Sequence, residues 1–398
     1  MQKIYNTAII GGGAAGLMTA VELTRGNSAL SGDEVLILER MDRVGKKLIA
    51  TGNGQGNLMN RNFSAQFYHG DKDFIDAFIA NTINIDLEKY LSELGIPLCT
   101  LKDGKMYPLS RQASAVLDII RAYLDSKGCV TKTDSFVTDV TKKGEYYTIK
   151  SSSGVYAAKS VVLAVGGAAQ KQFGTDGSSY SLAQNFGHKK SELYPSLVQL
   201  KTQTEQIRGL KGLKEVATVS AVVGGKTLTS STGDLLFTDY GVSGSAVFQV
   251  SAYLSGKENE YLNIEFLPEM SQEEVALLLK NRLSCGYIAK TDILVGILNK
   301  RIGQAVLKTV KEITAESVAH ALKNFKLKVT GNVGFNYAQV TKGGIKTKDI
   351  DKNTFESKLA KGVYIIGEML DVDGDCGGYN ITFAFSSAIS AARAIKGA

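Results

Sequence analysis

A glycine-rich turn between an apolar strand and an apolar helix constrains the fold of this chain more than any other feature. Residues 7–10 predict a buried strand, the letters GGGAAG follow at residues 11–16, and residues 17–25 carry apolar side chains at helical spacing. The glycines match G-x-G-x-x-G in the strand–turn–helix context that gives this pattern its meaning. The first permits a tight turn, the second lets a pyrophosphate approach the backbone, and the third lets the helix pack on the strand. The sequence therefore predicts a Rossmann-like dinucleotide-binding unit.

A second strand, which ends in an acidic residue, strengthens this prediction. Residues 34–39 read EVLILE, and Glu39 follows the glycines at close to the ~20 residues expected of a carboxylate that binds ribose hydroxyls. Such a carboxylate repels a 2′-phosphate, so the pattern favours an adenosine diphosphate group over NADP. The alternative interpretation is an ordinary surface acid at the end of a strand.

The other end of the sequence carries a second glycine-rich turn before a helix. Residues 362–367 predict a short buried strand, Glu368 follows it, residues 371–380 read DVDGDCGGYN, and residues 381–395 are rich in small and apolar side chains at helical spacing. This arrangement makes a second helix N-terminus that favours negative charge. A nicotinamide cofactor does not need such a site, whereas the longer FAD molecule running back under the last helix does. We therefore expect both ends of the sequence to bind one FAD.

Two further stretches suit close contact between backbone and ligand. The basic, glycine-rich residues 45–57 predict a loop whose amides surround a pyrophosphate or the flavin ring, with Lys46 or Lys47 offsetting phosphate charge. Residues 161–167 read VVLAVGG and predict a buried strand whose terminal glycine pair, including Gly167, lets the backbone pass close to a planar ligand.

The sequence gives no pattern for a metal site, a disulfide or a membrane span. The acidic residues 371–375 lack the distal glutamate of a calcium-binding EF-hand, the three histidines are far apart, and the four cysteines form no C-x-x-C. We therefore expect no bound metal and a reducing compartment, the cytoplasm. No stretch approaches eighteen apolar residues, so we expect neither a signal peptide nor a transmembrane helix.

Together these stretches resemble the HI0933-like flavoprotein family, whose members include proteins described as aminoacetone oxidases and as bile-acid-pathway flavin reductases. The resemblance rests on residues 11–16, 46–57, 104–114, 161–167 with 174–180, and 367–380. It implies an α/β fold in which a Rossmann-like FAD-binding domain of the glutathione-reductase type, made from both chain ends, carries an inserted β-rich domain with a helical subdomain.

The resemblance also implies which residues lie near FAD. They are Gly11, Gly13, Ala14, Ala15, Glu39, Arg40, Lys47, Asn53, Gly54, Val137, Gly367, Gly374, Asn380 and Ile381. The patterns described above add Gly16, Gly167 and Glu368 as cofactor-binding residues. In one place the chain departs from the family, because members usually carry Arg-Cys where this sequence has Gln55 and Gly56. A cation and a thiol expected near the flavin are therefore missing.

The domain boundaries follow from the change in pattern along the chain. Residues 1–193 and 335–398 are expected to form the FAD-binding domain, and residues 194–334 the inserted substrate or cap domain. Within the insert, short strands and turns predict a β-rich part over 194–268, and helical spacing predicts a helical part over 269–325.

The first part of the FAD-binding domain contains further predicted elements. Helices are predicted over 72–95 and 112–127, and a β-meander over 130–160. This meander supplies the predicted adenine contact, Val137.

These features predict an FAD-dependent oxidoreductase that acts on a small molecule by hydride transfer through flavin N5. An NAD(P)H-linked reductase and an amine or carbon oxidase both fit, and NAD(P)H, if used, binds transiently because the chain has one dinucleotide pattern. The helix that begins near Asn380 is expected to direct its positive end toward the N1/O2 edge of the ring. Catalytic candidates are Tyr379, with packing as its alternative role, and Arg208, with a solvated surface as its alternative.

The alternative function is a flavoprotein that modifies a macromolecule such as tRNA. The net charge of +7 permits this activity, but no block of five or six basic residues marks a nucleic-acid patch, so a small-molecule substrate is the expected partner. We expect no membrane partner, and the oligomeric state stays open.

Overall fold

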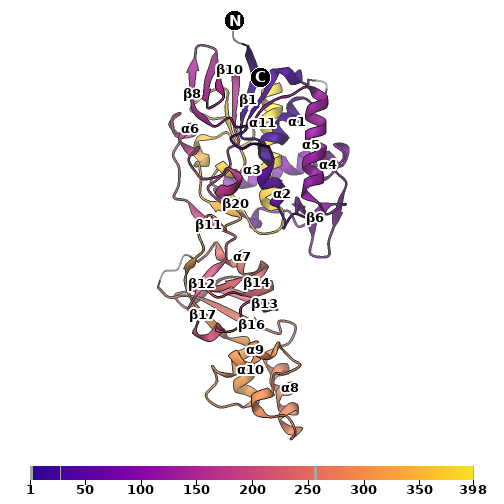
Figure 1. Ribbon diagram of the computed structural model, residues 1–398, viewed down its shortest axis with the longest axis vertical. Helices are drawn as coiled ribbons and strands as arrows, with labels where there is room; N and C mark the ends of the chain where they lie inside the picture. The colour runs from indigo at the N-terminus through magenta and orange to yellow at the C-terminus, as the bar shows by residue number, and fades with distance from the viewer. Residues whose placement is uncertain (1–2, 27, 255–257, 398) are drawn as a thin grey trace. The chain divides into compact units, whose positions relative to one another are not determined.

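The computed structural model describes residues 3–26, 28–254 and 258–397, which divide into two compact units (Figure 1). One unit combines the chain up to Tyr194 with the chain from Val340 onward, and the other comprises Pro195–Gln339. The sequence patterns predict that the chain passes from the first unit to the second at residue 194 and returns at residue 335. The indigo and yellow ends of the chain lie in the same unit, which holds both glycine-rich turns.

A mixed sheet forms the centre of the first unit. In spatial order its strands are β7 (Val130–Lys132), β2 (Val35–Leu38), β1 (Ile4–Ile10), β10 (Gly154–Leu163), β9 (Tyr146–Ser151) and β8 (Val137–Lys143), with β19 (Val363–Ile365) also paired to β10. Strands β7, β2, β1, β10 and β19 run parallel, whereas β8 and β9 form an antiparallel meander on β10. All four residues of β2 are buried, as expected of a parallel strand covered on both faces.

The first and last helices pack against each other. Helix α1 (Ala14–Leu23) follows β1 directly, and α11 (Tyr379–Lys396) follows the second glycine-rich turn; Figure 1 shows the two side by side. Small buried residues of α11, including Ala384 and Ala388, permit this close approach. Two segments from opposite ends of the sequence thereby become neighbours in one core.

Smaller elements complete the first unit. They are α2 (Lys46–Ala50), α3 (Lys72–Ile85), α4 (Leu87–Glu93), α5 (Ala113–Lys127), α6 (Tyr180–Gln184), β3 (Met59–Asn60), β4 (Tyr68–Gly70), β5 (Leu98–Thr100), β6 (Lys105–Pro108) and β20 (Val372–Gly374). Three expectations were wrong. The β-meander expected over 130–160 consists of β8, β9 and β10 only, because β7 pairs parallel with β2 instead. The single helix expected over 72–95 is broken at Asp86, which has a positive φ of 52° and caps α4 through Lys89 N–H. The loop expected over 45–57 begins with the short helix α2.

The second unit is built on a closed barrel. Its strands in spatial order are β12 (Leu200–Thr202), β15 (Gly241–Ser243), β14 (Lys226–Phe237), β13 (Lys214–Val223), β16 (Glu260–Phe266) and β17 (Phe325–Asn332). Its helices are α7 (Ser245–Ser251), α8 (Gln272–Ser284), α9 (Lys300–Leu307) and α10 (Ala315–Lys323). Helices α8, α9 and α10 lie between β16 and β17, which returns to close the barrel. The predicted β-rich insert with a helical subdomain is therefore confirmed.

Two short strands mark the crossings between the units, β11 (Tyr194–Ser196) and β18 (Val340–Lys342). In the described part of the chain, none of the helices combines the length and the apolar character that a bilayer crossing requires.

Candidate functional site

The three glycines of the first turn meet different surroundings. Gly11 has a φ of +104°, and a Cβ atom there would lie 2.4 Å from the carbonyl oxygen of Ala164. A Cβ atom on Gly16 would lie 1.9 Å from the carbonyl oxygen of Gly11. A Cβ atom on Gly13 would meet no atom of the described residues within 4 Å. Packing of the protein therefore requires glycine at positions 11 and 16, whereas position 13 borders open space.

The helix that starts at this open space has no cap of its own. Gly13 is the N-cap of α1 in an extended conformation, no side chain caps the helix, and its first turn contains no acidic residue. The first N–H groups of a helix have no partner within the helix and carry the positive end of its dipole. Ala14 and Ala15 thus present their amides where an anion such as a pyrophosphate can accept hydrogen bonds.

Glu39 lies at the end of β2 beside this turn. Its Oε2 atom accepts a 2.7 Å hydrogen bond from Gly12 N–H, and its Oε1 atom accepts one of 2.8 Å from Met41 N–H. Burial raises the pKa of Glu39, although the N–H groups of Met41 and Gly12 favour the ionised form. The Ser135 N–H donates to the carbonyl oxygen of Glu39 at 2.8 Å, which brings the segment leading to the buried Val137 alongside.

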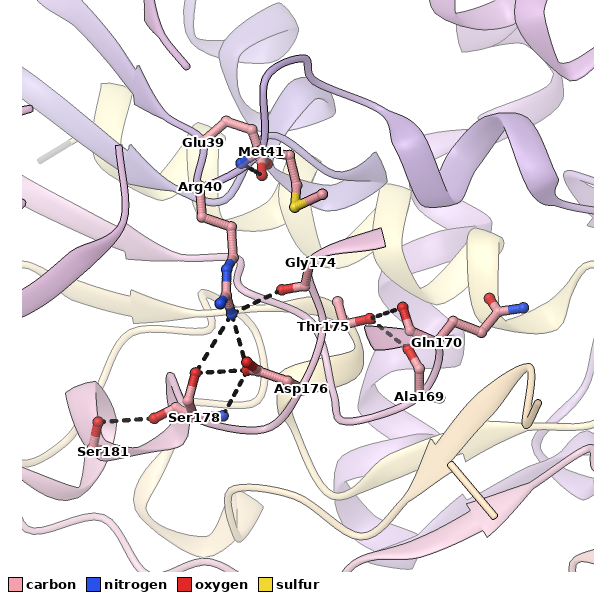
Figure 2. A network of polar contacts seen from close by, with 10 residues as sticks. All are labelled: Glu39, Arg40, Met41, Ala169, Gln170, Gly174, Thr175, Asp176, Ser178 and Ser181. Atoms are coloured by element: carbon pink, nitrogen blue, oxygen red, sulfur yellow. Dashed lines mark hydrogen bonds and ion pairs between the residues drawn. The ribbon is translucent and has the colours of Figure 1, made fainter. Parts of the chain in front are cut away.

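Arg40 joins the same strand end to residues 174–178, as Figure 2 shows. Its Nη1 atom donates to the carbonyl oxygen of Gly174 at 3.2 Å and forms an ion pair with Asp176 at 2.9 Å. The guanidinium also lies over the ring of Phe136, 4.6 Å from its centroid. Partial burial alone would raise the pKa of Asp176, but hydrogen bonds from Ser178 and Arg40 outweigh it and lower the pKa to about 2. Asp176 therefore stays anionic and holds the arginine.

The second glycine-rich turn is closed by Asn380. Its side-chain oxygen accepts from Gly374 N–H at 2.9 Å, and its amide nitrogen donates to the carbonyl oxygen of Gly374 at 2.7 Å. Gly378, with a φ of +99°, is the N-cap of α11, where a Cβ atom would lie 2.5 Å from the carbonyl oxygen of Met59. No side chain caps α11, and its first turn contains no acidic residue. The unit thus holds a second helix N-terminus that favours negative charge.

Direct contacts bring the two ends of the chain together. Gly367 lies so close to α1 that a Cβ atom on it would be 3.0 Å from the Cβ atom of Ala15. Lys47, which follows β2, forms a 2.7 Å ion pair with Glu368. A Cβ atom on Gly167 would lie 3.0 Å from Oε1 of Glu368. Five of the predicted site residues therefore lie close together: Ala15 of α1, Lys47, Gly167, Gly367 and Glu368.

The remaining predicted cofactor residues lie in turns or on α11. Asn53, with a φ of 56°, and Gly54, whose carbonyl oxygen accepts from Ala113 N–H at 2.8 Å, are exposed in the turn after α2. Ile381 is half-buried in the first turn of α11. At the position that departs from the family, Gly56 is buried with a φ of +79°. A larger side chain there would strain the backbone.

The two catalytic candidates have different surroundings. The ring of Tyr379 stacks on Phe67 at 4.7 Å between centroids, its hydroxyl donates to the carbonyl oxygen of Asn62 at 3.0 Å, and it is 4% exposed. These contacts fit the packing role given as the alternative for Tyr379, and its catalytic role stays a prediction. Arg208 belongs to the second unit, where it follows a short turn of helix and is exposed.

A cluster of titratable side chains that no sequence pattern predicts lies beside the second turn. His69, Asp373 and Asp375 lie together where β4 pairs with β20. The acids at alternate positions 371, 373 and 375 were a signal that they share one face of a strand. Nothing in the sequence linked them to a histidine 306 positions away from Asp375. Among the described residues, no three His, Cys, Asp or Glu side chains have the arrangement of a metal site.

Comparison with known proteins supports the resemblance. The chain is 34% identical to the 3-dehydro-bile acid delta(4,6)-reductase of Clostridium scindens, over 97% of this chain and 98% of the relative. It is 28% identical to the ribosomal RNA dihydrouridine synthase of Haemophilus influenzae over the full length of both. Its fold is similar to that of the 3-ketosteroid-delta4-(5alpha)-dehydrogenase of Rhodococcus jostii, with a TM-score of 0.51 and 15% identity over 98% of each chain.

The family assignment rests on almost the whole chain. Residues 5–394 match the model of the HI0933-like protein Rossmann domain. The glycine turn, the open space at Gly13 and the two uncapped helices fit an FAD molecule. The chain therefore belongs to the HI0933-like family of Rossmann-fold flavoproteins and is an FAD-dependent oxidoreductase.

Proposed function

We propose that this protein reduces a carbon–carbon double bond conjugated with a carbonyl group in a small molecule, with NAD(P)H as the electron donor. The main observation in support of the proposed cofactor site is the open space at Gly13, directly before the uncapped helix α1. The names of the relatives support the reaction class. A delta(4,6)-reductase saturates ring double bonds, and dihydrouridine is uridine with its ring double bond saturated. Both activities are reductions of a double bond in conjugation with a carbonyl.

In this proposal the residues of the first unit share the work of holding FAD. The amides at Gly13 and in the first turn of α1 bind the pyrophosphate, Ala14 among them, Glu39 accepts hydrogen bonds from ribose hydroxyls, and Val137 borders the adenine. Arg40, which forms an ion pair with Asp176, covers the adenosine end of the FAD molecule. The remaining proposed contacts are Gly11, Ala15, Gly16, Lys47, Asn53, Gly54, Gly167, Gly367, Glu368, Gly374, Asn380 and Ile381.

Toward the flavin ring itself, the chain's contribution is electrostatic. Bound FAD supplies hydride transfer through its N5 atom. The first-turn amides of α11 carry the positive end of an 18-residue helix and favour negative charge at the edge of the ring. Asn380 fixes the turn that precedes those amides, so their direction is set before any ligand binds.

NAD(P)H is proposed to bind transiently. The chain contains one G-x-G-x-x-G pattern, and in this proposal FAD uses it. In this proposal a nicotinamide donor binds briefly beside the flavin ring, is oxidised there and dissociates before the substrate binds. Such alternation predicts ping-pong kinetics.

Ribosomal RNA is the second candidate substrate. It is favoured by the relative named as an rRNA dihydrouridine synthase, which aligns with the whole chain. Both candidate substrates would undergo the same reduction. They differ only in the molecule that contains the double bond, a small molecule or ribosomal RNA.

One anaerobic experiment tests the proposal and separates the candidates. The FAD-loaded protein is reduced with NADPH or NADH and then mixed with a 3-dehydro bile acid that has 4,6 double bonds, or with unmodified rRNA. We expect the absorbance of oxidised flavin to return with the bile acid and the saturated product to be detected by mass spectrometry. If this absorbance returns with rRNA alone, the second candidate substrate is supported. Reoxidation by oxygen alone, with release of hydrogen peroxide, would contradict both.

A further inference from the structure

A histidine and three acids lie beside the turn that precedes α11. Strands β4 and β20 pair antiparallel, with His69 directly opposite Asp373. Directly opposed residues of an antiparallel pair project to the same side. Asp371 and Asp375 flank β20 at its two ends, and the charges of both act on Asp373. The pairing thus gathers four titratable groups at the end of a two-stranded sheet.

Within this cluster, His69 has a defined partner. Its Nε2 atom lies 2.9 Å from Oδ1 of Asp375, and the two side chains are 22% and 18% exposed. The N–H of Asp375 donates to the carbonyl oxygen of Phe67 at 2.9 Å. Asn380, in the first turn of α11, donates to the carbonyl oxygen of Asp375 at 3.4 Å. The imidazole is therefore held in a fixed position relative to the N-terminus of α11.

Asp373 is a buried acid that the structure leaves incompletely satisfied. It is 3% exposed, and its Oδ2 atom has no hydrogen-bond partner among the described residues. Burial raises the pKa of Asp373 to about 6, although the charges of His69 and Lys342 oppose this shift. A buried acid without a full set of partners is costly, and such groups concentrate at functional sites.

The charges around His69 favour its protonated form. The hydrogen bond to Asp375 raises the pKa of His69, partial burial opposes this, and the charge of Asp373 adds to it. Lys342 of β18 acts in the opposite direction. The other titratable groups facing the cluster are Asp371, Cys376 and Tyr379.

We propose that His69, oriented by Asp375, is the proton donor of the reduction. This inference rests on the proposed function. Saturation of a conjugated double bond adds a hydride to one carbon and a proton to its neighbour. In the proposed step the hydride arrives with two electrons that originate in NAD(P)H. The imidazolium N–H bond of His69 breaks, its electron pair stays on nitrogen, and a C–H bond forms from the electrons of the former double bond. Water then returns a proton to His69.

A purely structural role for the His69–Asp375 pair makes different predictions. A contact that only locked β4 to the turn would not need a buried, incompletely satisfied acid such as Asp373 beside it. Removing such a lock would also disturb the whole FAD site, so both halves of the catalytic cycle would slow together. A proton donor is needed in only one of them.

The test uses the FAD-loaded protein with the substitution His69→Gln. Gln retains a donor for Asp375 but cannot deliver a proton. We expect flavin reduction by NADPH to stay within about twofold of wild type, since that half-reaction does not use the proton. We expect reoxidation by the double-bond substrate, the 3-dehydro bile acid or rRNA, to slow by about 10²- to 10⁴-fold. His320→Gln, an exposed site in the second unit, is the matched control and should change neither rate.

The substitution Asp375→Asn provides a second test that keeps the imidazole. Because the chain has three histidines, their NMR signals can be assigned by single substitutions. We expect the pKa of His69 to fall in this variant. The pH at which reoxidation is lost, as pH rises and His69 loses its proton, should fall with it.

The outcomes separate this inference from the proposed function. Wild-type reoxidation rates in His69→Gln, or equal slowing of both half-reactions, would overturn the role of His69 while the reduction stands. If the pH dependence of flavin reoxidation is the same in Asp375→Asn as in wild type, the role of His69 is overturned as well. If no double-bond substrate reoxidises the wild-type flavin, the proposed function itself fails, and the role of His69 fails with it.

Discussion

The N–H of Gly12 donates a 2.7 Å hydrogen bond to Oε2 of Glu39, which joins the glycine turn after β1 to the end of β2. The other carboxylate oxygen accepts from Met41 N–H at 2.8 Å. Because β1 and β2 are parallel neighbours, their carboxyl ends meet at the same edge of the sheet. Ligands bind at this edge in open α/β sheets. The residue proposed to recognise ribose is thus fixed by the same turn that is proposed to bind the pyrophosphate.

The substitution Glu39→Gln should therefore affect both stability and FAD affinity. The amide offers one acceptor where the carboxylate offers two, so either Gly12 or Met41 loses its partner. We expect a loss of about 1–3 kcal/mol in the free energy of unfolding of the FAD-free protein. We also expect weaker FAD binding in a fluorescence titration. Glu145→Gln, at an exposed position, is the control. Unchanged FAD affinity in Glu39→Gln would contradict the assignment of this carboxylate to ribose.

The ion pair between Lys47 and Glu368 joins the two ends of the chain and should show measurable coupling. Its side chains are 23% and 20% exposed, so solvent screens it less than a surface pair. We expect Lys47→Met and Glu368→Gln to have a coupling energy of about 0.5–1.5 kcal/mol in a double-mutant cycle followed by urea unfolding. Strictly additive losses would mean that the pair contributes nothing.

A second link between the ends involves the last helix. Lys396 donates to Glu22 of α1 at 2.9 Å, where Tyr90 also donates to the carboxylate at 2.8 Å. The Glu22 side chain is 8% exposed, and Arg393 is a second, more distant cation at 3.4 Å, so removal of Lys396 leaves a buried charge poorly compensated. We expect Lys396→Met to lower the free energy of unfolding by about 2–4 kcal/mol. The exposed Lys352→Met should change it by less than about 0.5 kcal/mol. Equal effects of the two substitutions would show that this link is unimportant.

His188 should make the protein less stable in mild acid. It is 3% exposed, its Nε2 atom lies 2.7 Å from Ser357 Oγ, and burial lowers its pKa below the ordinary value of 6.5. The unfolded chain therefore takes up a proton that the folded chain resists. The contribution of His188 is fully present above pH 6.5 and is lost as the pH falls below it. We expect the melting temperature of His188→Gln to depend less on pH between 6.5 and 5 than that of wild type. A parallel pH dependence in the two proteins would contradict this.

Much of the fold could be predicted because its signals are local. The strand, glycine turn and helix at residues 4–23 lie within a short stretch of sequence, and so does the turn before α11. Helix α11 begins at Tyr379, next to the expected start near Asn380, and the ring of Tyr379 stacks on Phe67 in the first turn. The Asp86 break was missed because a single residue with positive φ leaves no mark on apolar periodicity.

Other features depend on contacts between distant residues. Lys46 or Lys47 was predicted to offset phosphate charge, and only the folded chain shows that Lys46 pairs with Asp42 and Lys47 with Glu368. The barrel of the second unit is closed by β17, which follows three helices and forms its pairs with strands earlier in the chain. The His69–Asp375 contact arises from the pairing of β4 with β20, and strand pairing across such separations has no signal in one sequence.

FAD affinity of the substitution Gly13→Ala tests the cofactor site most directly. Position 13 has a φ of −82°, and a Cβ atom there meets no protein atom within 4 Å, so the FAD-free protein should keep its fold and nearly all its stability. The methyl group would occupy the space proposed for the pyrophosphate. We predict that FAD binding, measured by fluorescence titration, weakens by at least about tenfold, or 1.4 kcal/mol, while Gly397→Ala at the far end of α11 binds FAD as wild type does. Wild-type affinity in a folded Gly13→Ala protein would contradict the proposed site.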